Sequence, residues 1–247
     1  MQRLADHSIV ITGAGAGIGR ACVDRYLSEG ASLIAADRDG DVLADLDGLD
    51  RVETVVVDVT EAGSAQALVD KALSAFGRLD GFHANAGGAF PTPFMDSDED
   101  YYRQTIALNL DAVWAAAKAS IPVFLDAGKG AFLTTSSGAG VNAVKGLTAY
   151  GAAKAGIQSL VKTLSLEYGA LGIRANAIAP GPIESPGLLA WLATRPGGVE
   201  AHVADHPMKR LGKPDEIAAA AAFLLSDDAS FVNGVTLAVD GGKQAVL

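Results

Sequence analysis

Hydrophobic stretches of strand length alternate with segments of helical periodicity along the whole chain. Most of the apolar runs lack strict polar alternation, which is typical of strands that are covered on both faces of a sheet. Between the third and fourth runs, apolar residues from Ala62 to Phe76 recur at helical spacing. This alternation predicts βαβ units and a parallel sheet. The predicted strands are Ser8–Thr12, Ala31–Asp37, Val52–Asp58, Leu79–Asn85, Ala131–Ser136, Ile173–Ala179 and Thr236–Val239.

No linker, repeat, low-complexity tract or charge run divides the sequence. The one change of pattern lies between Pro180 and Arg210, where Pro, Gly and bulky apolar residues interrupt the βα rhythm. Long irregular insertions in compact domains are often lids. We therefore expect a single domain over residues 1–247, with a segment at about 183–210 that covers the substrate.

Composition narrows the range of partners. The chain has a net charge of −10, and its Lys and Arg residues are scattered singly, so nucleic acid and anionic membrane surfaces are unfavourable partners. Cys22 is the only cysteine, which excludes an internal disulfide and a cysteine-based metal site, and we expect it to be buried. The polar start, Met1 to His7, lacks the apolar stretch of a signal peptide, and the longest apolar run, Ile217–Leu225, is shorter than a membrane span. A cytoplasmic protein is expected.

A glycine-rich turn follows the first predicted strand and precedes a helical pattern. Glycines at Gly13, Gly15, Gly17 and Gly19 allow backbone N–H groups and a helix N-terminus to approach a pyrophosphate. Such a turn alone is a weak signal, since Gly15 or Gly17 can simply be turn residues. Its place between a strand and a helix of a βαβ unit favours dinucleotide binding.

Asp37 closes the second predicted strand, 24 positions after Gly13. A carboxylate at this place can accept hydrogen bonds from both hydroxyls of an adenosine ribose and would repel a 2′-phosphate, which favours NAD over NADP. A turn or helix-cap aspartate is the alternative. Arg38 is an opposing feature, because a cation here can serve a 2′-phosphate.

Ser137, Tyr150 and Lys154 form a second constellation. A helix that begins near Thr148 places Tyr150 and Lys154 one turn apart on one face. The pKa of a free tyrosine is about 10, so tyrosine is a poor base at neutral pH unless a fixed positive charge favours its phenolate. Lys154 can supply that charge, and Ser137 can hydrogen-bond a substrate oxygen. A lone Tyr-x-x-x-Lys is more often a solvated pair, so the glycine turn is what makes the combination specific.

From about residue 4 to residue 242 the chain resembles the short-chain dehydrogenase/reductase family. The resemblance rests on Thr12, Gly13, Gly17 and Gly19 of the turn and on the Ser, Tyr and Lys. It implies a catalytic set of Asn109, Ser137, Tyr150 and Lys154, in which Asn109 holds a water that links Lys154 to solvent. The cofactor contacts that it implies, together with those argued above, are Gly13, Ala16, Gly17, Ile18, Gly19, Asp37, Arg38, Asp58, Val59, Asn85, Ala86, Gly87, Tyr150, Lys154, Pro180, Gly181, Ile183 and Ser185.

The resemblance implies an α/β fold, a doubly wound and mostly parallel seven-stranded Rossmann-like sheet with helices on both faces. It also implies an NAD-dependent oxidoreductase that interconverts a secondary alcohol and a ketone, with Tyr150 as general acid and base. The carboxyl end, from Phe231 to Gly242, resembles a tail that usually lies in a subunit interface, so a homotetramer is expected. Two mild departures are Ala84 where the family often has Asn, and Ser185 where Thr is common.

Other residues have plainer interpretations. His83 is expected in the core or near the adenine, while His202 and His206 are expected to be satisfied or exposed, and no metal site is predicted. The acidic residues from Asp96 to Asp100 suit a helix N-terminus, and Trp114 is expected to be packed. The two segments that usually form the substrate pocket suggest an apolar substrate body and contain Phe90, Pro91, Phe94, Leu188, Leu189, Trp191 and Leu192.

Three alternatives remain at this point. The first is a 3-oxoacyl-carrier-protein reductase, although such enzymes tend to have a basic docking residue where this chain has Leu171. The second is a cofactor-sensing binding protein without catalysis, which the intact Ser137, Tyr150 and Lys154 disfavour. The third is a methyltransferase, which has no use for the Tyr–Lys pair.

Overall fold

The computed structural model describes residues 2–88 and 91–245. Its centre is one sheet in which every neighbouring pair of strands is parallel, with the strand order β3-β2-β1-β4-β5-β6-β7. The doubly wound sheet predicted from the sequence is therefore confirmed. The strands are β1 Ser8–Thr12, β2 Ser32–Asp37, β3 Val52–Val56, β4 Gly81–Ala84, β5 Gly130–Thr135, β6 Ile173–Pro180 and β7 Thr236–Val239.

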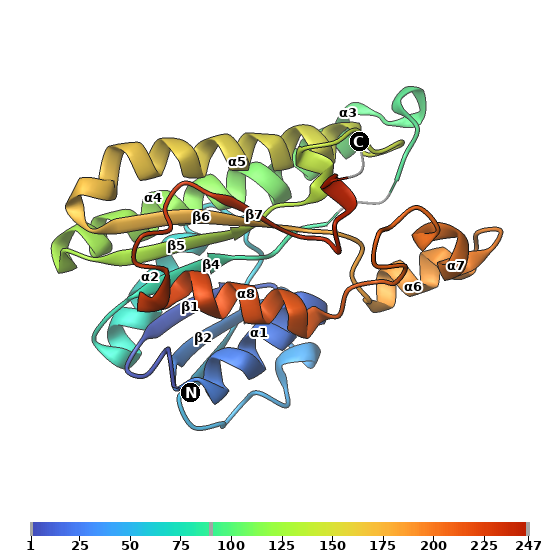
Figure 1. Ribbon diagram of the computed structural model, residues 1–247. Coiled ribbons are helices and arrows are strands. Elements are labelled where there is room, and N and C mark those ends of the chain that lie inside the picture. The colour runs from blue at the N-terminus through green and yellow to red at the C-terminus, as the bar shows by residue number, and fades with distance from the viewer. Residues whose placement is uncertain (1, 89–90, 246–247) are drawn as a thin grey trace.

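Helices cover both faces of the sheet, as Figure 1 shows. On one face, α1 and α8 pack over the β1, β2 and β5 side chains; on the other, α2, α4 and α5 pack over β4, β5 and β6. The inner strands β1, β4, β5 and β6 are buried on both sides, which explains why their apolar runs do not alternate. The helices are α1 Gly17–Ser28, α2 Ser64–Phe76, α3 Glu99–Ile106, α4 Ala112–Ala127, α5 Thr148–Tyr168, α6 Pro186–Ala193, α7 Gly198–Val203 and α8 Pro214–Leu225.

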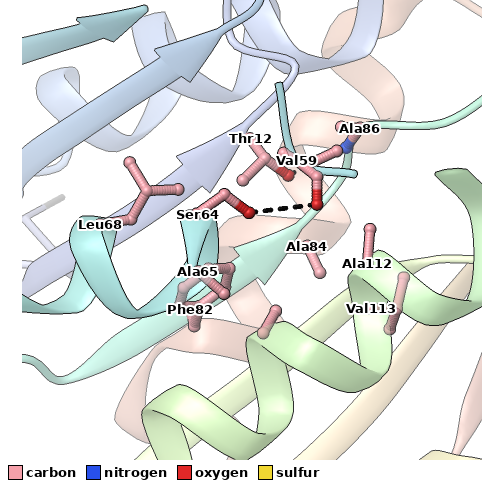
Figure 2. A pocket seen from close by; sticks show the side chains of 11 residues that line it. Thr12, Val59, Ser64, Ala65, Leu68, Phe82, Ala84, Ala86, Ala112 and Val113 are labelled. Carbon is pink, nitrogen blue, oxygen red and sulfur yellow. Dashed lines mark hydrogen bonds between the residues drawn. The ribbon is translucent and has the colours of Figure 1, made fainter. Parts of the chain in front are cut away.

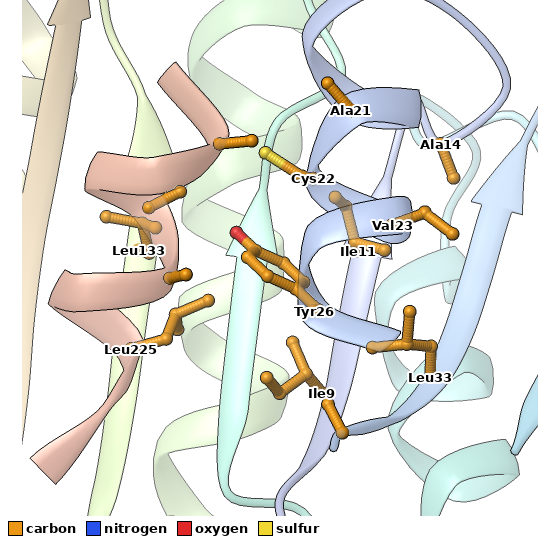
Figure 3. Close-up of a cluster of buried hydrophobic side chains, with 14 of the residues drawn as sticks. Ile9, Ile11, Ala14, Ala21, Cys22, Val23, Tyr26, Leu33, Leu133 and Leu225 are labelled. Atoms are coloured by element: carbon orange, nitrogen blue, oxygen red, sulfur yellow. The ribbon is translucent and has the colours of Figure 1, made fainter. Parts of the chain in front are cut away.

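The core on the α1 and α8 face is built from small and aliphatic side chains. Figure 3 shows Cys22 and Tyr26 of α1 among them, opposite Leu225 of α8. Cys22 is fully buried, as predicted. Tyr26 is the one large polar side chain in this cluster, and its hydroxyl reaches His83 beneath it in β4.

The segment between β6 and α8 departs from the βα rhythm, as the sequence indicated. It contains two short helices, α6 and α7, which project from one end of the sheet in Figure 1. These helices bury Leu192 against Val203 and Leu211 in a small cluster of their own. The segment is thus a separate packing unit attached to the sheet edge where β6 ends.

Residues Glu99–Ala127, from α3 through α4, form a helical stretch long and apolar enough to cross a membrane by length and composition alone. Sequence analysis considered only unbroken apolar runs and did not find it. In the fold, 44% of its most apolar window is buried inside the molecule, where Val113 and Phe124 belong to the core. The core helix of a soluble protein passes the same test.

Candidate active site

The glycine-rich turn joins β1 to α1 at the carboxyl edge of the sheet. Gly13 and Gly17 have positive φ angles of +66° and +54°, which glycine adopts without strain. A Cβ at Gly19 would lie 1.7 Å from the carbonyl oxygen of Gly13, so only glycine fits there. Ala16, the N-cap residue of α1, offers no side-chain cap. The N–H groups of the first helical turn, including that of Ile18, therefore suit a pyrophosphate.

Asp37 ends β2 beside this turn. One carboxylate oxygen accepts a hydrogen bond from the N–H of Gly15 at 3.0 Å, and the other accepts one from the N–H of Asp39 at 3.2 Å. The carboxylate thus stabilises the turn, as the alternative interpretation expected, and it is half-buried. The two roles are compatible, because a carboxylate has more acceptor sites than these two bonds use.

An open cleft next to Asp37 is strongly acidic. Hydrogen bonds from the hydroxyl and N–H of Thr60 lower the pKa of Asp58, so this carboxyl group is charged at neutral pH. Arg38 is the only cation among the lining residues of the cleft and is exposed. Sequence analysis named Arg38 and Asp58 but missed the other acids. The lining residues are Arg38, Asp39, Gly40, Asp41, Val56, Val57, Asp58 and Glu61.

The loop after β4 is tied to the glycine turn. The Thr12 hydroxyl accepts hydrogen bonds from the N–H groups of Asn85 and Ala86, both at 3.1 Å. The Asn85 amide donates to the carbonyl oxygens of Thr12 and Gly13 at 3.0 and 3.3 Å. Because β1 and β4 are neighbours across the point where the strand order reverses, these contacts lie where open α/β sheets bind ligands.

Behind this loop lies a small cavity with a volume of about 10 Å³, which is room for about one water. Figure 2 shows Thr12, Val59 and Ala86 at one side of it, and the hydroxyl of Ser64 donating to the carbonyl of Val59 at 3.2 Å. The rest of its wall comes from α2, β4 and α4. The cavity is too small for a substrate, and it backs onto the residues predicted to contact the cofactor.

Ser137 and Tyr150 meet where β5 ends and α5 begins. The helix starts at Thr148, as predicted. The Ser137 Oγ accepts the N–H of Ala139 at 3.1 Å. Burial raises the pKa of Tyr150 above its usual value, and the nearby Ser137 hydroxyl offsets only part of that rise.

Lys154 lies one turn further along α5 and is buried. Its Nζ is 5.4 Å from the centre of the Tyr150 ring and donates to the carbonyl of Thr135 at 2.8 Å. Burial lowers the pKa of Lys154 to about 7. The sequence indicated that the charge of Lys154 favours the Tyr150 phenolate, but the net shift of the Tyr150 pKa is upward because burial outweighs the other effects. Both groups are removed from water, and desolvation penalises both charged forms.

Asn109 lies in one turn of π-helix, Ala107–Asp111, between α3 and α4. Its Oδ1 accepts the N–H of Gly88 at 3.0 Å, and its Nδ2 donates to the carbonyls of Gly88 and Thr105, both at 2.9 Å. A Cβ at Gly87 would lie 2.8 Å from Asn109 Oδ1 and 3.0 Å from Lys154 Nζ. The fold thus brings Asn109, Gly87 and Lys154 together. The water-holding role of Asn109 stays a prediction.

The loop after β6 lies close to the glycine turn. Pro180 pairs with Val239, and the N–H of Gly181 donates to the Val239 carbonyl at 3.1 Å. Ser185 caps α6 by accepting the N–H of Leu188, and a Cβ at Gly17 would lie 3.9 Å from the Ser185 Cβ. Ser185 therefore faces the glycine turn. The side chain of Ile183 is instead buried in the core on the α1 and α8 face.

Three polar residues near the site were not predicted to act there. The backbone carbonyl of Thr135 accepts a hydrogen bond from the Lys154 ammonium. Gln158 donates to the hydroxyl of Ser136 at 2.9 Å and to the carbonyl of Ser137 at 3.3 Å, which ties α5 to the end of β5. A signal for Gln158 exists in the sequence, because it follows Lys154 by four residues on the same helical face. The two ring nitrogens of His83 are hydrogen-bonded to the hydroxyls of Tyr26 and Thr135.

The predicted substrate-pocket residues are only partly brought together. Phe90 lies outside the described residues. Phe94 is 68% exposed, whereas Leu192 is buried in the small cluster of α6 and α7. Trp191 packs edge-on against His202, with the guanidinium of Arg195 4.5 Å from its ring centre.

Two expectations about single residues are wrong. Trp114 is 55% exposed instead of packed, with the Lys118 ammonium 5.9 Å from its ring centre, because α4 turns its neighbour Val113 to the core. His206 is neither exposed nor satisfied, since it is buried and its Nδ1 has no hydrogen-bond partner among the described residues. The acidic segment behaves as expected: Asp98 caps α3 by accepting the N–H of Tyr101 at 2.7 Å.

Comparison with known proteins places this geometry among enzymes. The sequence model of the family described as Enoyl-(Acyl carrier protein) reductase matches residues 13–244. The chain is 36% identical to 3beta-hydroxysteroid dehydrogenase 2 of Eggerthella lenta, over 98% of this chain and 96% of that protein. It is 39% identical to cis-4-hydroxycyclohexanecarboxylate dehydrogenase of Sinomonas cyclohexanicum, over 99% of both chains. The crystal structure of levodione reductase superposes with a TM-score of 0.91 at 32% identity, covering 99% of this chain and 100% of that chain.

Proposed function

Because the chain belongs to the short-chain dehydrogenase/reductase family and interconverts a secondary alcohol and a ketone with a nicotinamide cofactor, we propose that its cofactor is NAD(H) and its proton-transfer residue Tyr150. The acidic surroundings of Asp37 carry the cofactor proposal. The contact of Tyr150 with Ser137 and Lys154 supports the proton-transfer role.

A nicotinamide cofactor bound at the glycine turn would supply or accept the hydride. The residues of this chain orient the substrate and move its proton. The Tyr150 hydroxyl donates its proton to the ketone oxygen in reduction, and its phenolate accepts the alcohol proton in oxidation. Ser137 donates a hydrogen bond to the same oxygen, and Lys154, held by the Thr135 carbonyl, places its ammonium beside the tyrosine ring. Asn109 completes the set beside Gly87, where its Oδ1 and the Lys154 Nζ approach the same point.

The preference for NAD(H) follows from charge. A 2′-phosphate near Asp37 would lie beside the cleft lined by Asp39, Asp41, Asp58 and Glu61, where Arg38 is the one cation among the lining residues. Like unit charges about 4 Å apart repel by about 4 kcal/mol at an effective dielectric constant of about 20. Solvent screening leaves about 1–3 kcal/mol, which corresponds to about 10- to 100-fold in kcat/KM.

The test is to measure kcat/KM with NADH and with NADPH on one turned-over ketone, in the wild type and in Asp37→Ala. The wild type is expected to favour NADH, and the variant is expected to narrow the gap. Asp50→Ala, which removes the same charge from a fully exposed surface position, is the control and should leave the ratio unchanged. Equal values in the wild type, or an unchanged ratio in Asp37→Ala, would refute the assignment of Asp37 to cofactor selection.

For the substrate we propose a secondary alcohol borne on an apolar carbon ring. The names of the two similar dehydrogenases specify a hydroxysteroid and a hydroxycyclohexanecarboxylate. The segment at about 183–210, with the apolar helices α6 and α7, is proposed to cover that ring. A comparison of cyclohexanol with the acyclic 2-hexanol tests this, with a higher kcat/KM expected for cyclohexanol. A preference for 2-hexanol would contradict the proposal.

A carrier-protein substrate is not favoured. The position just before β6 where a basic docking residue is expected holds Leu171, which is 53% exposed and uncharged. The net charge of −10 also repels an acidic carrier.

We further propose that the protein works in the cytoplasm as a homotetramer. Large apolar side chains support the assembly, since Phe231 is 100% and Leu166 is 85% exposed on the single chain. The edge strand β7 is also only partly covered.

A further inference from the structure

A chain of buried polar groups runs from the core to the cofactor turn. The Tyr26 hydroxyl lies 2.9 Å from Nδ1 of His83, and Nε2 of His83 lies 2.9 Å from the hydroxyl of Thr135. That hydroxyl donates to Oδ1 of Asn85 at 2.9 Å. Tyr26 and His83 are completely buried, and Thr135 is nearly so. Polar groups removed from water in this way are costly unless their hydrogen bonds are complete.

The direction of every bond in this chain is fixed by its last member. The Asn85 Nδ2 faces the carbonyls of Thr12 and Gly13, which can only accept, so Oδ1 must face Thr135. Thr135 therefore donates its single hydroxyl proton to Oδ1 of Asn85. Consequently His83 must donate from Nε2, and its Nδ1 must accept from the Tyr26 hydroxyl. Burial lowers the pKa of His83 to about 3, which keeps this tautomer uncharged at neutral pH.

The far end of the chain is the wall of the cofactor site. Asn85 clamps the backbone of Gly13, the residue whose carbonyl lies against Gly19. Thr135 uses its hydroxyl for Asn85 and its carbonyl for the Lys154 ammonium. A change in the orientation of Thr135 or Asn85 would therefore alter the shape of the glycine turn while Lys154 keeps its backbone partner.

We propose that His83 is a positioning residue for the nicotinamide dinucleotide: its Nε2–H orients the Thr135 hydroxyl, and through it the Asn85 amide that shapes the Gly13 turn. The inference rests on the proposed binding of the cofactor across that turn. His83 touches neither substrate nor cofactor and acts only through Thr135 and Asn85.

The test compares a variant of His83 itself with a variant that removes only the hydrogen bond to its Nδ1. His83→Leu removes the Nε2–H donor, and the Kd for NADH in a fluorescence titration is expected to rise about tenfold, because Thr135 loses its donor. The kcat at saturating NADH should change less than about threefold, since Lys154 keeps the Thr135 carbonyl. Tyr26→Phe is the matched control. It removes the hydroxyl on the Nδ1 side, lowers Tm, and leaves the Kd at the wild-type value.

The conservative variant His83→Gln carries an amide donor and is expected to recover part of the lost affinity. A Kd for His83→Leu within about twofold of the wild type, with a lowered Tm, would overturn the proposal, as would an equal rise of Kd in Tyr26→Phe. Failure of the wild type to bind either NADH or NADPH is a different result, which overturns the cofactor proposal and the inference together.

The tautomer can be tested in the folded wild type even where a variant fails to fold. In ¹⁵N NMR of histidine-labelled protein, assigned by the signal lost in His83→Gln or by through-bond correlation, His83 is expected to carry its proton on Nε2 from pH 5 to pH 8. A proton on Nδ1, or titration of the ring within that range, would overturn the proposed direction of the bonds.

Discussion

Tyr150 lies in surroundings that oppose the ionisation on which alcohol oxidation depends. The nearby Ser137 hydroxyl favours the phenolate, but burial has the larger effect and raises the pKa of Tyr150. The neutral hydroxyl is therefore the resting form, which is the form that donates a proton to a ketone. This residue carries the two predictions that most directly test the proposed chemistry.

The variant Tyr150→Phe keeps the ring and removes only the oxygen that carries the proton. We expect kcat to fall by about 10²- to 10⁴-fold, the usual contribution of a general acid or base, while the Kd for NADH stays within about twofold of the wild type. Tyr168→Phe, at the other end of α5, is the control and should keep full activity. Retention of more than about a tenth of the wild-type kcat by Tyr150→Phe would contradict the assignment.

The raised pKa of Tyr150 predicts opposite pH profiles for the two directions. Oxidation requires the phenolate, so its kcat/KM should rise steadily from pH 6 to pH 10. Reduction requires the protonated hydroxyl, so ionisation of Tyr150 should lower its kcat/KM only above the raised pKa, and a fall near pH 7 would report the deprotonation of Lys154. Initial rates in both directions over this range check the sign. An oxidation rate that is level from pH 6 upwards would show that Tyr150 is not the proton acceptor.

The sequence predicted the positions of the motif residues better than it predicted their electrostatics. The spacing of Tyr150 and Lys154 predicted that they share a helical face, and Ser137 was expected to share the site with them. The net sign of the tyrosine pKa shift was not predicted, because it depends on how much protein surrounds both groups, and that is a property of the fold. His83 was expected in the core or near the adenine, and it is in the core. Its link to Asn85 was not predicted, since it runs through Thr135 of the neighbouring strand β5, which is distant in the sequence.

At the scale of elements, the strands were predicted to within a few residues. The differences occur at ends, such as β4, which begins at Gly81 instead of Leu79, because a strand end is set by its neighbour's hydrogen bonds. The π-helical turn around Asn109 and the split of the segment after β6 into α6 and α7 were not predicted. Neither has a strong periodic signal, and both depend on tertiary contacts.

The junction of β1 and α1 allows a prediction about a single methyl group. In most helices Gly→Ala is stabilising, by about 0.5–1 kcal/mol. A Cβ at Gly19 would lie 1.7 Å from the Gly13 carbonyl oxygen, and backbone cannot move aside as a side chain can. We expect Gly19→Ala to lower Tm and to weaken NADH binding at least tenfold. Gly187→Ala in α6, where a Cβ meets open space, is the control and should keep or raise Tm. An unchanged Tm and Kd in Gly19→Ala would contradict the close approach.

At the scale of the whole molecule, large exposed apolar side chains occur at several places, and two of these places suit contacts between chains. Tyr102, Trp114 and Leu166 are 53%, 55% and 85% exposed on α3, α4 and α5, which belong to the layer on one face of the sheet. Phe231 is 100% exposed and precedes β7 at the edge of the sheet. Single exposed apolar residues are common, so we expect the interaction surfaces at the group on α3, α4 and α5 and at Phe231, whose side chain is completely exposed. Two different two-fold contacts per chain are what a closed tetramer needs.

We therefore expect light scattering at micromolar concentration to give four times the mass of one chain. The double variant Trp114→Lys with Leu166→Lys places charges in one contact only, and burying an unpaired charge is costly, so the variant should give twice the mass of one chain, a dimer held by the contact near β7. Phe231→Lys should also give a dimer, held by the other contact. The matched control is Leu49→Lys, a 45% exposed position outside both regions, which should remain tetrameric. A wild-type mass equal to one chain would refute the assembly, and a tetrameric mass in both contact variants would show that these side chains do not form it.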